Sequence, residues 1–247
     1  MTDYLDITTK IDFIKSASVA QKKDFSKIVS FIKKRNITKL FHFTHISNLE
    51  SILIEGFQTR MFLDSNLYQF QTTDPHRLDG FPESISFSIG EPNRLLFARK
   101  NFDFENQLVL LEVSASSLLI QNFAAFPSNA ASGFFKEKIV NDPERYMGIK
   151  SLEGLYLNNA LREKARLSSE VPTDTQSELL FFEEISPNAI QKVHIPSHFP
   201  LLMLPTVQKL RSASEPTLFE LTCECGLFDR QEGPFRRYNI GWEENGQ

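Results

Sequence analysis

The chain has 247 residues, of which 41% are hydrophobic and 23% charged, a composition that is typical of a folded globular protein and excludes wholesale disorder. The formal net charge of −4 disfavours a protein that coats nucleic acid by bulk electrostatics, but it allows a local basic cleft. No run of 18 apolar residues and no signal-like N-terminus occurs, so we expect a cytoplasmic protein that has no contact with a membrane.

Several common catalytic motifs are absent from the sequence. The ten glycines form neither G-x-G-x-x-G nor G-x-x-x-x-G-K-[ST], which argues against a Rossmann site and a P-loop. H-E-x-x-H and G-x-S-x-G are absent too. Cys223 and Cys225 are awkwardly spaced for a mutual disulfide and favour ordinary thiols over zinc ligands. No metal is therefore expected, although metal binding by these two cysteines stays open.

The predicted elements begin with a helix over residues 11–35, where apolar side chains recur every three or four positions. Residues 39–44 then alternate with period two, which predicts a strand. His42 lies on one face of this strand, and Phe41 and Phe43 lie on the other. We therefore expect His42 to face a cleft and not the main core.

A short helix and a long loop follow this strand. Ser47 and Glu50 have the spacing of a capping box, and Gly56 is a natural helix stop, so a helix is predicted between Ser47 and Gly56. Residues 57–83 have no clear period and contain turn-forming residues. A loop of that length in a compact domain is usually functional or mobile.

The next predicted elements are a half-buried strand at residues 84–89, a helix begun by Pro92 at 92–100 and a buried strand at 107–113. A broken helical region at 134–166, a polar loop at 167–176 and two further strands at 178–183 and 190–195 follow. Residues 200–247 yield no assignment. Because strands and helices are mixed without regular βαβ alternation, the fold class is α+β.

Three polar residues carry candidate chemistry, and each has a structural alternative. His42 is either a buried histidine bonded to the backbone or part of a donor–acceptor pair, with Thr44, for a ligand. Glu178 starts an apolar strand and is either a surface carboxylate or a group at a cleft rim that stabilises positive charge on a sugar. Arg77 is either solvated or a clamp for phosphate or carboxylate.

Three blocks of the sequence together resemble the DarT family, the toxin components of DarT–DarG-type toxin–antitoxin pairs, which ADP-ribosylate DNA bases using NAD. The first block is the strand, cap and helix of residues 40–56. The second is Asp74–Gly80 with residues 85–93, and the third is residues 176–190. The resemblance covers about residues 36–196.

This resemblance implies an ADP-ribosyltransferase fold, with two small packed sheets, an NAD cleft between them and flanking helices. Its donor-site and catalytic positions fall on nine residues of this chain. His42, Phe43 and Thr44 would hold nicotinamide and the adjoining ribose, Ser51 and Thr59 would line the NAD site, Arg77 would contact phosphate and accept a proton, Phe97 would stack on nicotinamide, Glu178 would be catalytic, and Gln176 would meet the acceptor.

The chemistry of the residues agrees with this assignment. Breaking the nicotinamide–ribose bond leaves an oxocarbenium-like sugar, which a carboxylate at Glu178 can stabilise. The pKa of an arginine exceeds about 12, so Arg77 fits a phosphate clamp better than a proton acceptor. NAD is here a substrate, so no Rossmann motif is required.

The acceptor is expected to contact the loops at residues 57–83 and 167–177. An enzyme can modify a base only when that base is unstacked, which favours single-stranded DNA as the substrate. The basic residues Arg94, Arg99, Lys100, Arg162, Lys164 and Arg166 form either a local track for nucleic acid or solvated helix charges. Open alternatives are the same chemistry on RNA, as in a phage-defence toxin, or on protein, NAD hydrolysis, and a non-catalytic partner domain.

We divide the chain into an N-terminal helical segment (1–35), a transferase domain (36–199) and an extension (200–247). The extension carries apolar residues and either packs on the domain or binds a partner. A separate antitoxin protein is the expected partner, because nothing in the sequence looks like a built-in inhibitor.

Overall fold

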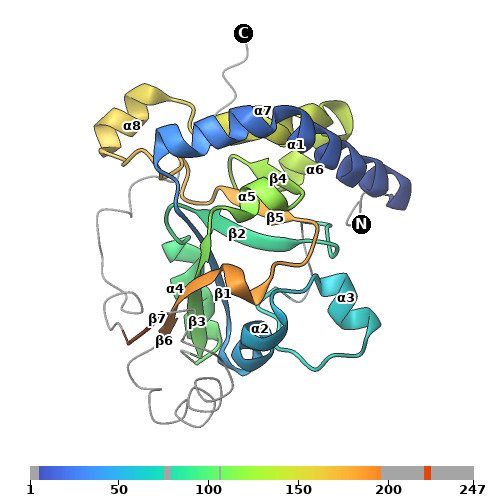
Figure 1. The fold of residues 1–247 in the computed structure, drawn as a ribbon, viewed down its shortest axis with the longest axis vertical. Coiled ribbons are helices and arrows are strands. Elements are labelled where there is room, and N and C mark those ends of the chain that lie inside the picture. The colour runs from blue at the N-terminus through green and yellow to red at the C-terminus, as the bar shows by residue number, and fades with distance from the viewer. Residues whose placement is uncertain (1–5, 75–78, 106, 196–219, 224–247) are drawn as a thin grey trace.

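The computed structural model of the protein describes residues 6–74, 79–105, 107–195 and 220–223. Its strands hydrogen-bond in the order β4-β5-β2-β1-β3-β6-β7, which leaves β1 in the centre (Figure 1). The strands are β1 (Lys39–His45), β2 (Ile85–Ile89), β3 (Leu108–Ser114), β4 (Phe123–Phe126), β5 (Glu178–Phe181), β6 (Ile190–Ile195) and β7 (Glu220–Cys223). All neighbouring strands are antiparallel except β6 and β7.

Helices flank the sheet, and this mixture confirms the α+β class. They are α1 (Ile7–Arg35), α2 (Leu49–Glu55), α3 (Arg60–Ser65), α4 (Arg94–Asp103), α5 (Ser117–Ile120), α6 (Gly133–Asn141), α7 (Gly148–Gly154) and α8 (Asn159–Ala165), with 3₁₀ turns η1 (Ile46–Asn48), η2 (Pro143–Tyr146) and η3 (Pro187–Ala189). No helix in the described ranges is both long enough and apolar enough to cross a membrane.

The central strand pairs unequally with its two neighbours. All seven residues of β1 have partners on β3, from Lys39 to His45. On the other side only Leu40 and Phe41 have partners on β2. Beyond Phe41 the two strands part, so the series divides into β4-β5-β2 and β1-β3-β6-β7. The two expected sheets are thus joined by one short ladder.

Three apolar clusters hold helices against the sheet in the described residues, and the smallest packs Phe97 of α4 on Phe41 of β1 and on β3. The larger cluster buries the core-facing side chains of β1, β2 and β3 with α2 and the C-terminal half of α1. The second is rich in phenylalanine: Phe13 and Ala17 of α1 pack with Phe81, Phe126 and Phe182. The helix predicted over 11–35 is therefore part of the core, and burial of its apolar stripe provides much of its stability.

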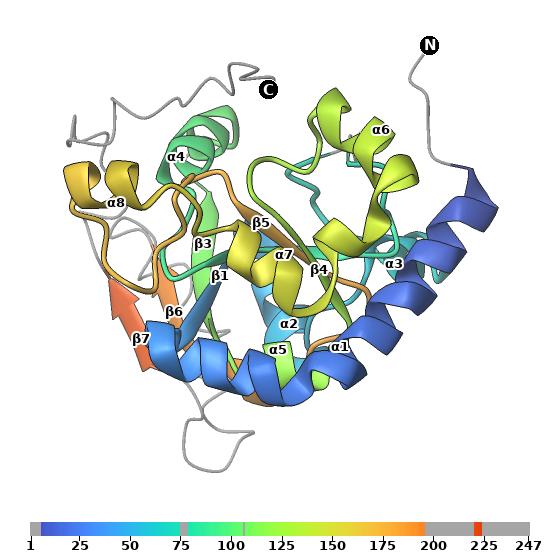
Figure 2. The ribbon, with the colours of Figure 1, turned by 90° about the horizontal axis from the view of Figure 1, so that it is seen from above.

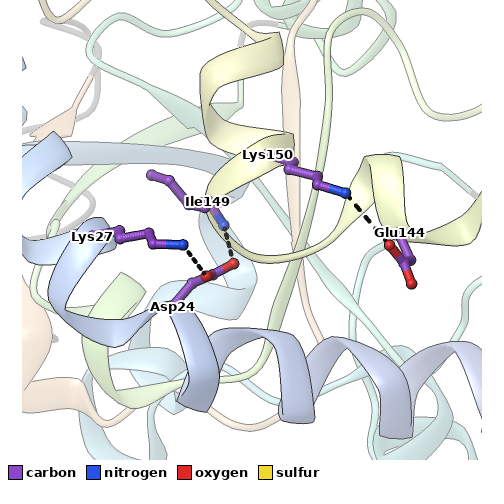
Figure 3. Close-up of polar contacts among 5 residues, drawn as sticks. All are labelled: Asp24, Lys27, Glu144, Ile149 and Lys150. Atoms are coloured by element: carbon purple, nitrogen blue, oxygen red, sulfur yellow. Dashed lines mark hydrogen bonds and ion pairs between the residues drawn. The ribbon is translucent and has the colours of Figure 1, made fainter.

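Helix α1 is fixed to α7 by a close polar contact (Figures 2 and 3). Asp24 accepts the backbone N–H of Ile149 at 3.3 Å and faces the Lys27 ammonium at 3.3 Å. Gly148 has a φ of +58°, and a Cβ there would lie 2.8 Å from the Asp24 carboxylate. Only glycine fits this backbone and this approach without strain.

Two elements between residues 45 and 83 differ from the predicted ones. The predicted loop 57–83 contains α3, whose N-cap is Thr59: its hydroxyl accepts the N–H of Phe62 at 3.3 Å. The helix expected from Ser47 begins instead with η1, where the His45 ring accepts the N–H of Ser47 at 3.2 Å.

Two further elements differ from the predictions because their sequence signals are weak. The helix expected to start at Pro92 begins at Arg94, and Asn93 caps it by accepting the N–H of Leu96. Strand β4 was not predicted, since the fully buried segment Phe123–Phe126 has no alternation to reveal it.

Candidate active site

A cleft of about 480 Å³ opens where β1 and β2 part. Segments between Phe41 and Glu178 line it. They are β1, β2, α2, the chain from α3 to Asp74, α4, residues 129 and 131, and residues 176–178. Its volume lies within the range of about 300–1,000 Å³ that is usual for small-molecule sites.

Glu178 stands at the cleft wall as the first residue of β5 and is half-buried. Its Oε1 accepts a hydrogen bond from the Ser86 hydroxyl, and its Oε2 accepts the backbone N–H of Ala130 at 3.0 Å. These two donors come from β2 and from the segment after β4, so both oxygens of the carboxylate have fixed directions.

Ser86 links this carboxylate to His42. The Ser86 hydroxyl binds Glu178, while its backbone carbonyl lies 2.8 Å from Nδ1 of His42. A carbonyl only accepts, so Nδ1 carries the hydrogen and donates it. In the neutral ring Nε2 is then the acceptor nitrogen.

The His42 ring lines the cleft, but it also belongs to the packing beneath it. Its centroid lies 5.1 Å from that of Phe57 and 5.2 Å from that of Phe87, and both phenylalanines are in the larger core cluster. The expectation that His42 avoids the main core is therefore only half right. The structural alternative, a histidine bonded to the backbone, is confirmed, and the role of His42 in holding a ligand stays a prediction.

Asn48, a residue that the sequence analysis did not single out, holds one wall of the cleft. Its side-chain NH₂ donates to the Thr44 hydroxyl at 2.9 Å and to the Gln71 carbonyl at 2.7 Å. The side-chain oxygen of Asn48, Oδ1, accepts the backbone N–H of Gln71 at 2.9 Å. Asn48 thereby fixes Thr44 and ties the chain after α3 to the sheet. Its place within the motif of residues 40–56 was the one signal that could have found it.

The remaining residues predicted for the NAD site are placed differently from one another. Phe43 and Ser51 line the cleft, and the Ser51 hydroxyl donates to the Asn48 carbonyl at 2.9 Å. Thr59 caps α3 and is not among the lining residues. Phe97 is buried behind Phe43, with 5.5 Å between the ring centroids, so Phe43 is the ring of this pair that lines the cleft.

Gln176 lines the cleft two residues before Glu178, and its backbone N–H donates to Oδ1 of Asp174 at 2.8 Å. Arg77 lies outside the described residues. Within the described ranges no group of three or more His, Cys, Asp or Glu side chains is arranged to hold a metal ion. Cys223 lies in β7, and Cys225 is beyond the described part of the chain.

The basic residues considered for a nucleic-acid track do not act as one set. Arg99 and Lys100 of α4 line the cleft. Arg162 is buried, with 7% of its surface exposed. Arg162 is therefore not part of a solvent-facing track.

A family model described as "ssDNA thymidine ADP-ribosyltransferase, DarT" matches residues 41–200, more than half of the chain. The chain belongs to the DarT family. No curated protein sequence matches it. The matched residues include the whole Ser86–Glu178–His42 linkage and the walls of the cleft.

Three solved structures of DarT proteins are similar to this chain at low sequence identity. Thermosipho africanus DarTG in complex with ADP-ribose is 14% identical, with a TM-score of 0.51 over 77% of this chain and 50% of that one. The chain thus spans about half the length of that protein. Thermus sp. 2.9 DarT in complex with NAD⁺ is 14% identical over 78% and 98% of the two chains, with a TM-score of 0.47.

A second structure of that Thermus protein, in complex with ADP-ribosylated ssDNA, is 13% identical over 78% and 96% of the chains, with a TM-score of 0.45. The match to the Thermosipho protein confirms the ADP-ribosyltransferase fold that the sequence motifs of this DarT-family chain imply.

Proposed function

We propose that this DarT-family protein transfers ADP-ribose from NAD to a thymidine base of single-stranded DNA, with Glu178 as the catalytic carboxylate. The observation that carries the proposal is the linkage through Ser86, which places Glu178 and His42 in one cleft. The match to a family of ssDNA thymidine ADP-ribosyltransferases supplies the substrate class.

The cleft has the chemistry that NAD requires. A neutral His42 that donates through Nδ1 offers Nε2 to the amide N–H of nicotinamide, and Thr44 lies next to it on the same face. Phe43 offers an aromatic surface to the nicotinamide ring. Arg99 and Lys100 of α4, which also line the cleft, are suited to the diphosphate. Arg77 remains a further candidate for a phosphate clamp.

The reaction exchanges one bond at the ribose for another. The bond from C1′ to the nicotinamide nitrogen breaks, its electron pair leaves with neutral nicotinamide, and the sugar becomes oxocarbenium-like. The Glu178 carboxylate, aimed by Ser86 and Ala130, stabilises that positive charge. A ring nitrogen of the base then forms the new bond to C1′, and its proton is released to the solvent.

The acceptor base is expected to approach over residues 167–177. Gln176 lines the cleft close to Glu178 in sequence, and its amide offers both a donor and an acceptor to a base edge. The base must be unstacked to reach the sugar, which favours a single strand over a duplex.

The biological setting follows from the same proposal. A DNA-modifying enzyme needs both DNA and NAD, so we place it in the cytoplasm of its host. An antitoxin protein is then needed to protect the host's DNA, by capping the cleft or by removing the modification.

Labelled NAD and a set of matched polymers test the proposal. The protein is incubated with single-stranded DNA that contains thymidine, the same DNA without thymidine, its duplex, RNA of the same sequence and a protein mixture, and the products are analysed by mass spectrometry. Adducts confined to thymidine in the single strand are expected. Adducts on RNA or protein alone, or free ADP-ribose as the sole product, would show another acceptor.

A further inference from the structure

Arg162 of α8 is buried and directs its guanidinium at the loop that precedes Glu178. One terminal nitrogen donates to the Val171 carbonyl at 2.7 Å and to the Thr173 hydroxyl at 3.3 Å. The other donates to the Ser168 carbonyl at 2.8 Å. Its described hydrogen-bond acceptors thus all belong to residues 168–173.

A second arginine and one tyrosine complete the attachment of this loop. The Tyr156 ring lies between the two guanidiniums, 4.0 Å from that of Arg35 and 5.1 Å from that of Arg162. Its hydroxyl donates to the Glu170 carbonyl at 2.8 Å, and burial raises its pKa, so the phenol keeps its proton. The Arg35 guanidinium donates to the Ser169 backbone carbonyl, and the Ser169 hydroxyl donates to the Arg35 backbone carbonyl.

The fixed part of the loop leads directly to the active site. Thr173 donates its backbone N–H to the Leu155 carbonyl at 2.8 Å and its hydroxyl to the Leu157 carbonyl at 2.6 Å. The next residue, Asp174, is buried and accepts the backbone N–H groups of Gln176 and Ser177. Hydrogen bonds from Arg162 therefore fix the loop as far as Thr173, and those of the next residue, Asp174, fix it as far as Ser177.

Stability alone gives little reason for a buried arginine here. Burial is costly for a cation, and it lowers the pKa of Arg162. Among the described residues its hydrogen-bond partners are neutral oxygens. A buried charge is weak evidence for stabilisation, since apolar side chains of similar volume often do as well. What arginine adds is a rigid fork of donors that fixes several acceptors at once, which lysine cannot match.

We propose that Arg162 is a positioning residue for the acceptor: it holds residues 168–174 in one shape so that Gln176 presents its amide to the nucleobase. The inference rests on the proposed function, because it assigns a role on the acceptor side of the same cleft. The NAD side is built on β1, β2 and α4, which lie outside this hydrogen-bonded series.

The test compares Arg162→Lys with the control Lys150→Gln, which removes a positive charge from an exposed position of α7 that does not line the cleft. We expect Arg162→Lys to raise the KM for a thymidine-containing oligonucleotide about tenfold, the cost of one lost charge-assisted hydrogen bond. The Kd for NAD, measured calorimetrically, should change less than twofold. Hydrogen exchange at residues 167–177 should become faster, and Lys150→Gln should leave all three readouts unchanged.

A gentler variant covers the case in which Arg162→Lys does not fold. Thr173→Val removes one acceptor at nearly constant volume, and it should raise the same KM in the same direction by a smaller factor.

An unchanged oligonucleotide KM in the folded variants overturns the inference. An equal rise in KM for Lys150→Gln would also overturn it, because it would show a general effect of surface charge. If the wild type modifies no DNA, the proposed function fails instead, and unchanged hydrogen exchange in the variants would then show separately that Arg162 does not hold the loop.

Discussion

Glu178 and Glu112 are two carboxylates of one sheet that the fold uses differently. Glu178 is half-buried at the cleft wall, and its two oxygens accept from the Ser86 hydroxyl and from a backbone N–H. Glu112 on β3 is buried, and its two oxygens bind the Lys39 ammonium at 2.8 Å and the His194 ring at 2.8 Å.

Partners on two neighbouring strands give Glu112 a structural role. Burial raises the pKa of its carboxyl, but the hydrogen bonds and charges of Lys39 and His194 outweigh burial and lower the pKa overall. Because Lys39 is on β1 and His194 on β6, the cluster joins three adjacent strands. A glutamate bonded to a histidine is therefore not by itself a site, since Glu178 lines the cleft and Glu112 does not.

The largest effect should come from Glu178→Gln, which keeps the shape of the side chain and removes its charge. We expect the rate of ADP-ribose transfer to fall at least about 100-fold, because the lost interaction is made mainly in the transition state. Incorporation of labelled NAD into single-stranded DNA measures this. Near-normal transfer by the folded variant would contradict the assignment.

The same change at Glu112 should act on stability and not on chemistry. Glu112→Gln leaves two donors of the buried cluster without their carboxylate, and we expect the free energy of unfolding to drop by about 1–3 kcal/mol. Urea titration at pH 7 measures it, with the transfer rate as the control. A large loss of transfer without a loss of stability would give Glu112 a role in the reaction.

His42→Phe separates the two roles of the histidine. The aromatic volume between Phe57 and Phe87 is kept, so stability should change by less than about 1.5 kcal/mol. Both ring nitrogens are lost, and the Kd for NAD should rise about tenfold. Calorimetric titration with NAD, beside a thermal melt, distinguishes this outcome from a purely structural histidine, for which the melting temperature falls while the Kd stays constant.

The smallest effect is a pH dependence carried by Glu112. Its pKa in the folded protein lies below the ordinary value of 4.5. Its stabilising contribution is therefore fully present well above pH 4.5 and is lost as the pH falls through the folded pKa. The difference in unfolding free energy between the wild type and Glu112→Gln should narrow below about pH 4.5. A difference that stays constant from pH 7 to pH 3 would contradict the lowered pKa.

Local patterns predicted the elements that carry the site because periodicity reports which face of an element is apolar. Ile85, Phe87 and Ile89 of β2 are buried as their alternation indicates. The site residues His42, Thr44, Gln176 and Glu178 were named from sequence motifs, and all four line the cleft. Motif matching also predicted Thr59 and Phe97 for the NAD site, but neither lines the cleft. Thr59 caps α3, and Phe97 is buried behind Phe43.

The sequence by itself thus determined the fold class, the family and the two residues, His42 and Glu178, that Ser86 joins in the cleft. Only the tertiary structure decided that Ser86 joins Glu178 to His42, that Asn48 ties down a cleft wall, and that Arg162 turns inward to a loop. The physical reason is that the spacing of apolar residues along the sequence indicates only which face of one strand or helix is buried. Which edges pair, and where β1 and β2 part to open a cleft, depend on contacts between segments far apart in the chain.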